Sequence, residues 1–177
     1  RYSGYVSILV RQEDGTYTKT VSSYDENYSS AFGFTSSDGK YAIVGSSSAK
    51  PRVYYNNNGT LISIGTLSYT SSNSYAPYSI YNPKTKVLAV PTGYTAKGVY
   101  NTWHFYQLTE TSITYLGKYS GSLIDVSHDD KYVLNGTSSS VSLARAARNE
   151  SGLITGATNI STVTSTFSGV LNGWFLN

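Results

Sequence analysis

The chain has 177 residues, enough for one sizeable core, and carries a net charge of +3 from 13 Lys and Arg against 10 Asp and Glu. Its basic residues are scattered singly, which excludes the basic run typical of a nucleic-acid-binding surface. Without Cys, disulfides and thiolate chemistry are excluded. No apolar run approaches the roughly 18 residues of a membrane span. We therefore expect neither nucleic-acid binding nor membrane insertion.

The first residue is not a plausible native start. Met is absent from the whole chain, and Arg1 is not one of the small residues that normally allow an initiator Met to be removed. We expect the chain to be a piece of a longer polypeptide.

Short strands joined by turn residues follow one another along the chain. The first pair, 5–10 and 16–21, flanks Glu13-Asp14-Gly15, and the second, over 34–44, turns at Asp38-Gly39. Gly, Asn and Asp favour such turns because they tolerate a left-handed backbone or hydrogen-bond their own backbone. Further hairpins are predicted over 52–64, 80–90, 103–116, 126–134, 141–154 and 166–176.

The hairpins repeat with a regular period. Lys40, Lys86 and Lys131 occupy the same place in three of them and lie 46 and 45 residues apart. A period of roughly 40–50 residues with four strands per unit predicts an all-β fold, a β-propeller of four-stranded antiparallel blades. The terminal hairpins either pair to close a ring or belong to a larger ring. As a single domain, the chain divides into a half-blade 1–24, blades 29–70, 74–120 and 121–158, and a half-blade 162–177.

One segment also carries a family resemblance. Ser37 to Gly45 resembles the Ser-Pro-Asp-Gly-Lys-Tyr-Leu-Ala-Val-Gly segment of WD-repeat-like and lactonase-like propellers. The match is partial in the later repeats, where Asp-Gly is replaced by Lys84-Thr85 or Asp129-Asp130, and the Gly-His and Trp-Asp dipeptides of true WD repeats are absent. The resemblance implies a propeller scaffold for binding, with enzymes in the minority.

Residues that could carry catalysis are sparse. His104 and His128 belong to different blades, and no Gly-x-Ser-x-Gly motif is present. Most acidic residues fall in predicted turns, and no pattern places two of them face to face. Asp25-Glu26-Asn27 and Asp129-Asp130 could contribute oxygens to Ca²⁺, but two adjacent carboxylates do not make a cage. We expect no catalytic group, no metal site and no cofactor.

Tyrosine is the compositional anomaly, with 18 residues. Tyr packs well on sheets, yet many aromatics fall in the connections that would emerge at one face of a propeller. Aromatic rings beside Asn, Lys and hydroxyl groups suit a protein or glycan partner. The predicted binding residues are Tyr24, Tyr28, Tyr75, Tyr94, Lys97, Tyr100, Asn101, Trp103 and Tyr119.

Low charge and abundant Tyr, Ser and Thr favour a non-enzymatic structural and recognition module of a larger extracellular or virion assembly, with a phage tail or capsid-associated protein preferred. Its partners would be proteins of that assembly or a glycan, and oligomer formation is left open. One alternative is a secreted or surface enzyme, lactonase-like or glycan-active. Another is an intracellular adaptor of the WD-repeat type.

Overall fold

A computed structural model describes residues 4–24, 31–46, 49–68, 79–94, 100–127, 129–137 and 140–164. These residues form fourteen strands and no helix. No helix that could cross a membrane is found in this part of the chain. The strands are β1 (Gly4–Arg11), β2 (Tyr17–Tyr24), β3 (Ala31–Thr35), β4 (Tyr41–Ser46), β5 (Ala49–Asn57), β6 (Thr60–Thr66), β7 (Ile80–Asn82), β8 (Val87–Tyr94), β9 (Tyr100–Leu108), β10 (Ile113–Ser120), β11 (Leu123–Val126), β12 (Tyr132–Gly136), β13 (Ser140–Arg148) and β14 (Ile154–Thr164).

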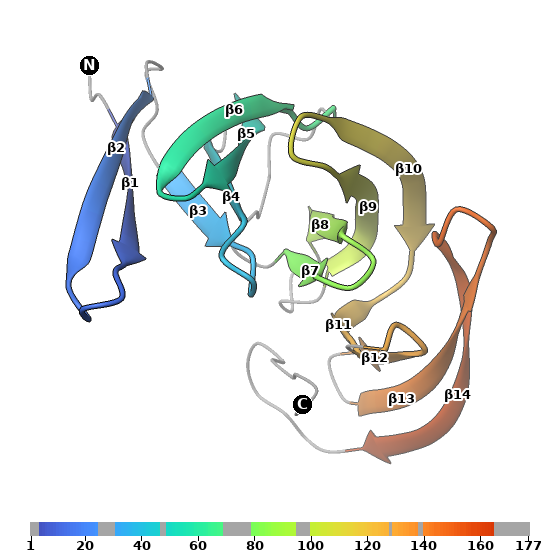
Figure 1. The fold of residues 1–177 in the computed structure, drawn as a ribbon. Coiled ribbons are helices and arrows are strands. Elements are labelled where there is room, and N and C mark those ends of the chain that lie inside the picture. The colour runs from blue at the N-terminus through green and yellow to red at the C-terminus, as the bar shows by residue number, and fades with distance from the viewer. Residues whose placement is uncertain are drawn as a thin grey trace. The chain divides into compact units, whose positions relative to one another are not determined.

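The chain forms two compact units. The first comprises Arg1–Pro77 and Glu110–Ile113, and the second comprises Tyr78–Thr109 and Thr114–Asn177. The first unit holds the two-stranded sheet β1-β2 and the four-stranded sheet β3-β4-β5-β6. The second unit holds β7-β8-β9-β10 and β11-β12-β13-β14, in which β11 contacts β7 and β9 (Figure 1). Each four-stranded sheet is an antiparallel meander of consecutive strands, as a propeller blade requires, which confirms the predicted fold class.

The cores lie on the inner and central strands of the blades. In β4 the four residues from Tyr41 to Val44 are all buried, and so are the four from Val87 to Val90 in β8. Burial of successive residues means that both faces of these strands are covered. The last strand of each four-stranded meander shows the opposite pattern, since most of β14 is exposed. Hydrophobic burial thus decreases from the inner and central strands of a blade to its last strand.

Turn chemistry sets the hairpins. Asn58 and Gly59 both have positive φ, 49° and 91°, which is the requirement of the two-residue turn that joins β5 to β6. The predicted blade 121–158 differs at its end, because β14 continues to Thr164 and pairs with β13 along that length. The predicted hairpin 166–176 lies outside the described residues, so closure of a ring stays a prediction.

Candidate functional site

The turns between the first and second strands of two blades share one set of hydrogen bonds. The Ser36 hydroxyl donates to Asp38 Oδ1 at 2.6 Å and accepts the Tyr41 amide at 2.8 Å. In the second unit, Ser127 donates to Asp129 Oδ1 at 2.8 Å and accepts the amide of Tyr132 at 2.9 Å. These bonds fix the backbone of both turns in the same form.

In all three four-stranded blades, the turn between the first and second strands has a backbone carbonyl that accepts a hydrogen bond from a side chain of the third strand. Asn56 donates to the Gly39 carbonyl at 3.0 Å, and Gln107 donates to the Thr85 carbonyl at 2.8 Å. In the last blade Arg148 Nε takes this part and donates to the Asp130 carbonyl at 3.0 Å. The donor to this carbonyl is therefore a neutral side-chain amide in two blades and a guanidinium cation in the third.

The capped residue of the same blade is an acid, where the other two blades have Gly39 and Thr85. Gly39 has φ +69° and Asp130 has φ +66°, so both occupy the left-handed region. Glycine enters this region without steric cost, while a residue with a side chain is strained there by about 1–2 kcal/mol, with Asp among the better tolerated. Asp130 thus has the left-handed backbone that Gly39 has in the first unit. Its carbonyl is capped by Arg148 and not by a neutral amide.

The two departures meet in an ion pair. Arg148 Nη2 lies 2.6 Å from Asp130 Oδ1, and each side chain is 16% exposed. Nη1 of the same arginine donates to the Gly152 carbonyl at 2.5 Å. The buried side chain of Asn82, at the end of β7, also hydrogen-bonds the Asp130 carboxylate. We call these three residues the Asn82–Asp130–Arg148 cluster.

Burial dominates the electrostatics of the cluster. It raises the pKa of Asp130, although Arg148 and the Asn82 hydrogen bond act in the opposite direction. Burial likewise lowers the pKa of the Arg148 guanidinium, against the attraction of Asp130. Both shifts favour the neutral forms, so desolvation outweighs the attraction within the pair. A neutral amide caps the other two turns, so among the described residues the buried ion pair is particular to this blade, which makes the cluster the candidate site of the second unit.

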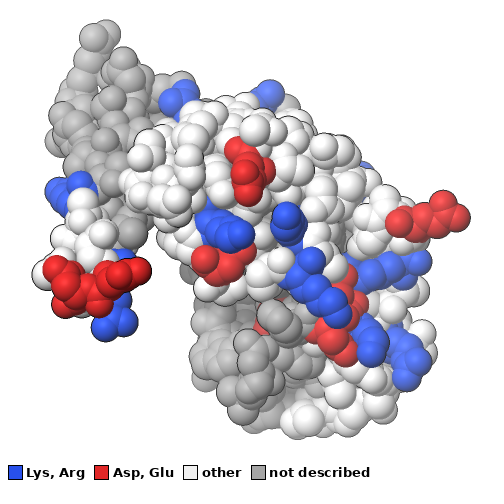
Figure 2. Space-filling model, viewed as in Figure 1, with Lys and Arg blue, Asp and Glu red and all other residues white. Residues whose placement is uncertain are grey.

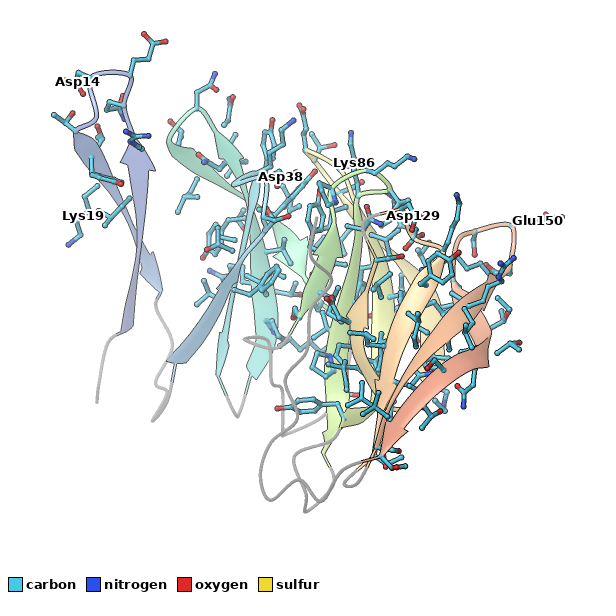
Figure 3. The ribbon with its side chains drawn as sticks, turned by 90° about the horizontal axis from the view of Figure 1, so that it is seen from below. Asp14, Lys19, Asp38, Lys86, Asp129 and Glu150 are labelled. Carbon is cyan, nitrogen blue, oxygen red and sulfur yellow. The ribbon has the colours of Figure 1, made fainter. Side chains whose placement is uncertain are left out.

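The cluster offers a base beside hydrogen-bond donors. Of the five N–H groups of a guanidinium, three donate to acceptors within the described residues, which leaves two for a ligand oxygen. Lys86, Asp129 and Glu150 lie at the same end of the strands in the second unit (Figure 3). Basic and acidic side chains gather on the face of this unit seen in Figure 2. The exposed lysines of the turns around the cluster are Lys84, Lys86 and Lys131.

Two of the predicted binding residues are core residues. Trp103 is 1% exposed and Tyr100 is 8% exposed. Their rings meet edge to face at a centroid distance of 6.1 Å, and the indole N–H donates to the Tyr100 carbonyl at 3.3 Å. These two rings therefore pack within β9 and do not present themselves to a partner. Asn101, between them in the sequence, is exposed, and Tyr119 on β10 is half-buried, which raises its pKa.

The structure does not test the other members of that predicted face. Tyr24 and Tyr94 end β2 and β8, and only their backbone is described. Tyr28, Tyr75 and Lys97 lie outside the described residues, so the tyrosine-rich face stays a prediction.

The remaining sequence candidates have ordinary partners or lie outside the described residues. His104 Nδ1 is 3.2 Å from the Tyr115 hydroxyl, and burial, with Lys118 nearby, lowers the pKa of this imidazole. Asp130 faces Arg148 rather than a cation site. Among the described residues, no group of three or more His, Cys, Asp or Glu is placed to hold a metal. His128 and Asp25-Glu26-Asn27 lie outside that part of the chain.

Comparisons with known proteins give matches only among solved structures, since no family model and no curated protein matches. A Bacteroides uniformis protein assigned as a 6-phosphogluconolactonase has a TM-score of 0.61 at 16% identity, over 91% of this chain and 49% of its own. The periplasmic gluconolactonase of Pseudomonas aeruginosa has a TM-score of 0.55 at 15% identity, over 90% and 44%. A Bacteroides fragilis protein also assigned as a 6-phosphogluconolactonase has 0.52 at 18%, over 76% and 38%.

The fold is a β-propeller. It is similar to that of the lactonases, as the resemblance of Ser37–Gly45 implied, and the chain spans less than half the length of each of these three proteins. The comparisons lend no specific support to the WD-repeat part of that resemblance.

The predicted function is corrected by these matches. The predictions of a non-enzymatic virion or phage module and of no enzymatic activity were wrong, because the three structures above that share this fold are named as lactonases. Low charge and abundant Tyr, Ser and Thr are features of strand-rich propellers whether or not they are enzymes, so composition did not discriminate. A search along the sequence also missed the Asn82–Asp130–Arg148 cluster, since Arg148 and Asp130 are 18 residues apart and meet only across the blade.

Proposed function

We propose that this chain is part of a lactonase-like enzyme that opens a sugar lactone by hydrolysis, with the Asn82–Asp130–Arg148 cluster at its reacting centre. The observation that carries the proposal is the ion pair itself, which replaces the glycine and the neutral amide of the equivalent turn in the first unit. The fold shared with lactonases supports the reaction class by analogy.

The reaction follows from the groups in the cluster. The Asp130 carboxylate accepts a proton from a water molecule, whose oxygen forms a bond to the lactone carbonyl carbon. The two remaining N–H groups of Arg148 donate to the carbonyl oxygen as negative charge grows on it. The ring C–O bond then breaks, and the proton held by Asp130 passes to the departing alkoxide, which leaves a hydroxy acid. Asn82 holds the carboxylate in place by its hydrogen bond.

The surrounding charge favours an acidic sugar. Lys84, Lys86 and Lys131 are exposed on the turns that carry Asn82 and Asp130. Ammonium groups bind phosphate and carboxylate oxygens as point charges. A phosphorylated lactone is therefore expected to be hydrolysed with a lower KM than the unphosphorylated one.

The test uses the purified protein that contains this chain and measures hydrolysis of gluconolactone and 6-phosphogluconolactone by the acid that is released. Asp130→Asn should lower kcat/KM by about 10²–10⁴-fold, the usual contribution of a general base. Asp38→Asn, in the equivalent turn of the first unit, is the matched control and should leave the rate unchanged. Absence of hydrolysis in the parent protein would refute the lactonase proposal, and full activity in Asp130→Asn would refute the assignment of the site.

For the location, we propose a secreted or periplasmic protein. The Pseudomonas aeruginosa protein that shares the fold is described as periplasmic, which supports this location. Cell fractionation with a cytoplasmic marker enzyme tests it, and recovery of the protein with that marker would refute it.

A further inference from the structure

The first unit contains a small cavity that the proposed reaction does not use. It has a volume of about 270 Å³ and lies at the end of the β5–β6 hairpin, against the turn residues Glu110 and Thr111 that belong to the same unit. Its other walls include Tyr55, Ile62 and Ser63, of which Tyr55 and Ile62 are cross-strand partners in β5 and β6. This volume is slightly below the range of drug-sized pockets and suits a ligand of one ring.

One wall of the cavity is apolar and open. Ile62, within β6, is 43% exposed, so its side chain is open to a ligand. Across the strand pair, the Tyr55 ring is held by the buried Tyr41 ring at a centroid distance of 5.7 Å. The wall formed by Tyr55 and Ile62 can therefore take the C–H face of a ligand without rearrangement.

The other wall is rich in hydrogen-bonding groups. The Glu110 carboxylate accepts a hydrogen bond from the Tyr55 hydroxyl. A carboxylate has about four acceptor positions, so most of them remain for donors from a ligand. Asn57, Ser63 and Thr111 add an amide and two hydroxyl groups, which both donate and accept. Strong acceptors and mixed donors on one side, with an apolar face on the other, complement a molecule that alternates O–H and C–H groups.

The charge of the cavity disfavours an anion. Burial, the hydrogen bond to Glu110 and the charge of Glu110 all raise the pKa of Tyr55. Burial and then Asp38 raise the pKa of Tyr41, with Tyr55 and Glu110 adding to the effect. Glu110 forms no ion pair with any residue that the structure describes. Of the described residues that line the cavity, Glu110 is thus the one that is charged, whereas lysines flank the cluster of the second unit.

We propose that this cavity binds a neutral monosaccharide or the terminal neutral sugar of a glycan, with Glu110 as the main acceptor for its hydroxyl groups. The proposal does not depend on lactonase activity, because its residues belong to the first unit and none of them is part of the Asn82–Asp130–Arg148 cluster. The sugar would lay one face on Tyr55 and Ile62 and direct two hydroxyl groups to the Glu110 carboxylate.

The experiment is saturation-transfer NMR with the parent chain and D-glucose, D-galactose or D-mannose, with D-glucuronate and D-glucosamine as charged comparators. At least one neutral sugar should show transfer with a Kd of about 1 mM, and glucuronate should bind less tightly. Glu110→Gln should weaken binding about tenfold or more, because a hydrogen bond to a charged group is lost. Ile62→Ala, at an exposed position that tolerates truncation, should also weaken it.

Glu150→Gln is the matched control, since Glu150 lies in the corresponding turn between β13 and β14 of the second unit. It should leave sugar binding unchanged, and thermal unfolding followed by circular dichroism should confirm that all three variants are folded. The proposal is overturned if no neutral sugar shows transfer, if Glu110→Gln binds as well as the parent, or if binding requires the amine of glucosamine. Each of these results leaves the lactonase test unaffected.

Discussion

Arg148 makes two different bonds to Asp130, one from Nε to the backbone carbonyl at 3.0 Å and one from Nη2 to the carboxylate at 2.6 Å. The first bond is the cap that every comparable turn in the described residues receives, and the second exists because Asp130 has a carboxylate where the other capped residues are Gly39 and Thr85. The pair thus combines a carbonyl cap, which an amide provides in the other two blades, with a buried charge pair that those two described turns lack.

Arg148→Ala should destabilise the protein by about 3 kcal/mol, because it leaves the Asp130 carboxylate buried without its partner and removes two carbonyl caps. Arg148→Gln should cost less, since Gln107 shows that glutamine can cap such a turn. Urea unfolding followed by fluorescence measures both. Equal stability of Arg148→Ala and the parent would mean that the pair is more hydrated than its burial indicates.

The double variant Asp130→Gly with Arg148→Gln restores the neutral pattern of the other blades. We expect its free energy of unfolding to lie within about 1 kcal/mol of the parent's, because glycine relieves the left-handed backbone and both charges of the buried pair are removed together. The two single changes should together cost more than the double change, a coupling that residues in direct contact show. Lactone hydrolysis should nevertheless be lost in the double variant. Loss of folding in the double variant would assign the pair a purely structural function.

The fold was predictable because turn residues and strands recur with one period, and the same feature explains what was missed. The Ser-x-Asp turns at Ser36 and Ser127 are local, and their hydrogen bonds span few residues. The Asn82–Asp130–Arg148 cluster depends on the register that sets Tyr132 opposite Arg145 and brings Arg148 to the turn. A comparison of repeats could have found Asp130 in place of Gly39. It could not have found Arg148, because this residue lies two positions beyond Ala146, the register equivalent of Asn56.

The burial of Tyr100 and Trp103, two residues of the predicted tyrosine-rich face, has a different physical cause. Trp103 was predicted at the start of the hairpin 103–116, beside a connection at the binding face, yet β9 begins at Tyr100 and its aromatic residues are buried on both faces. Strand periodicity separates an inner from an outer face only when one face meets solvent. In β9 the aromatic residues are interspersed with Asn101, Thr102 and His104. From the sequence, such a central strand therefore cannot be distinguished from an exposed segment rich in polar and aromatic residues.

Trp103→Ala should destabilise the protein by about 3–5 kcal/mol, the range for deleting a buried large aromatic side chain. Asn101→Ala, at the neighbouring exposed position, should change stability by no more than about 0.5 kcal/mol. Thermal and urea unfolding of both variants provide the comparison. If Trp103→Ala is as stable as Asn101→Ala, the ring is not a core residue and the original assignment to a binding face returns.

Two adjacent acids should give opposite pH dependences of stability. The pKa of Asp130 is raised by burial above its ordinary 3.8, so its contribution to stability is present below pH 3.8 and is lost as the pH rises through the folded-state pKa. The pKa of Asp129 is lowered by hydrogen bonds from the Ser127 hydroxyl and the Lys131 amide. Its contribution is present above pH 3.8 and is lost as the pH falls through the folded-state pKa.

Urea unfolding from pH 2 to pH 7 of the parent, Asp130→Asn and Asp129→Asn measures both effects as differences between curves. Relative to Asp130→Asn, the parent should lose stability as the pH rises above about 4, while relative to Asp129→Asn it should lose stability as the pH falls below about 4. Lactone hydrolysis should rise with pH in the range where the Asp130 contribution to stability falls, because both report loss of the same proton. A rate that is constant across this range while the stability difference changes would separate Asp130 from the proton transfer and leave it as a structural residue.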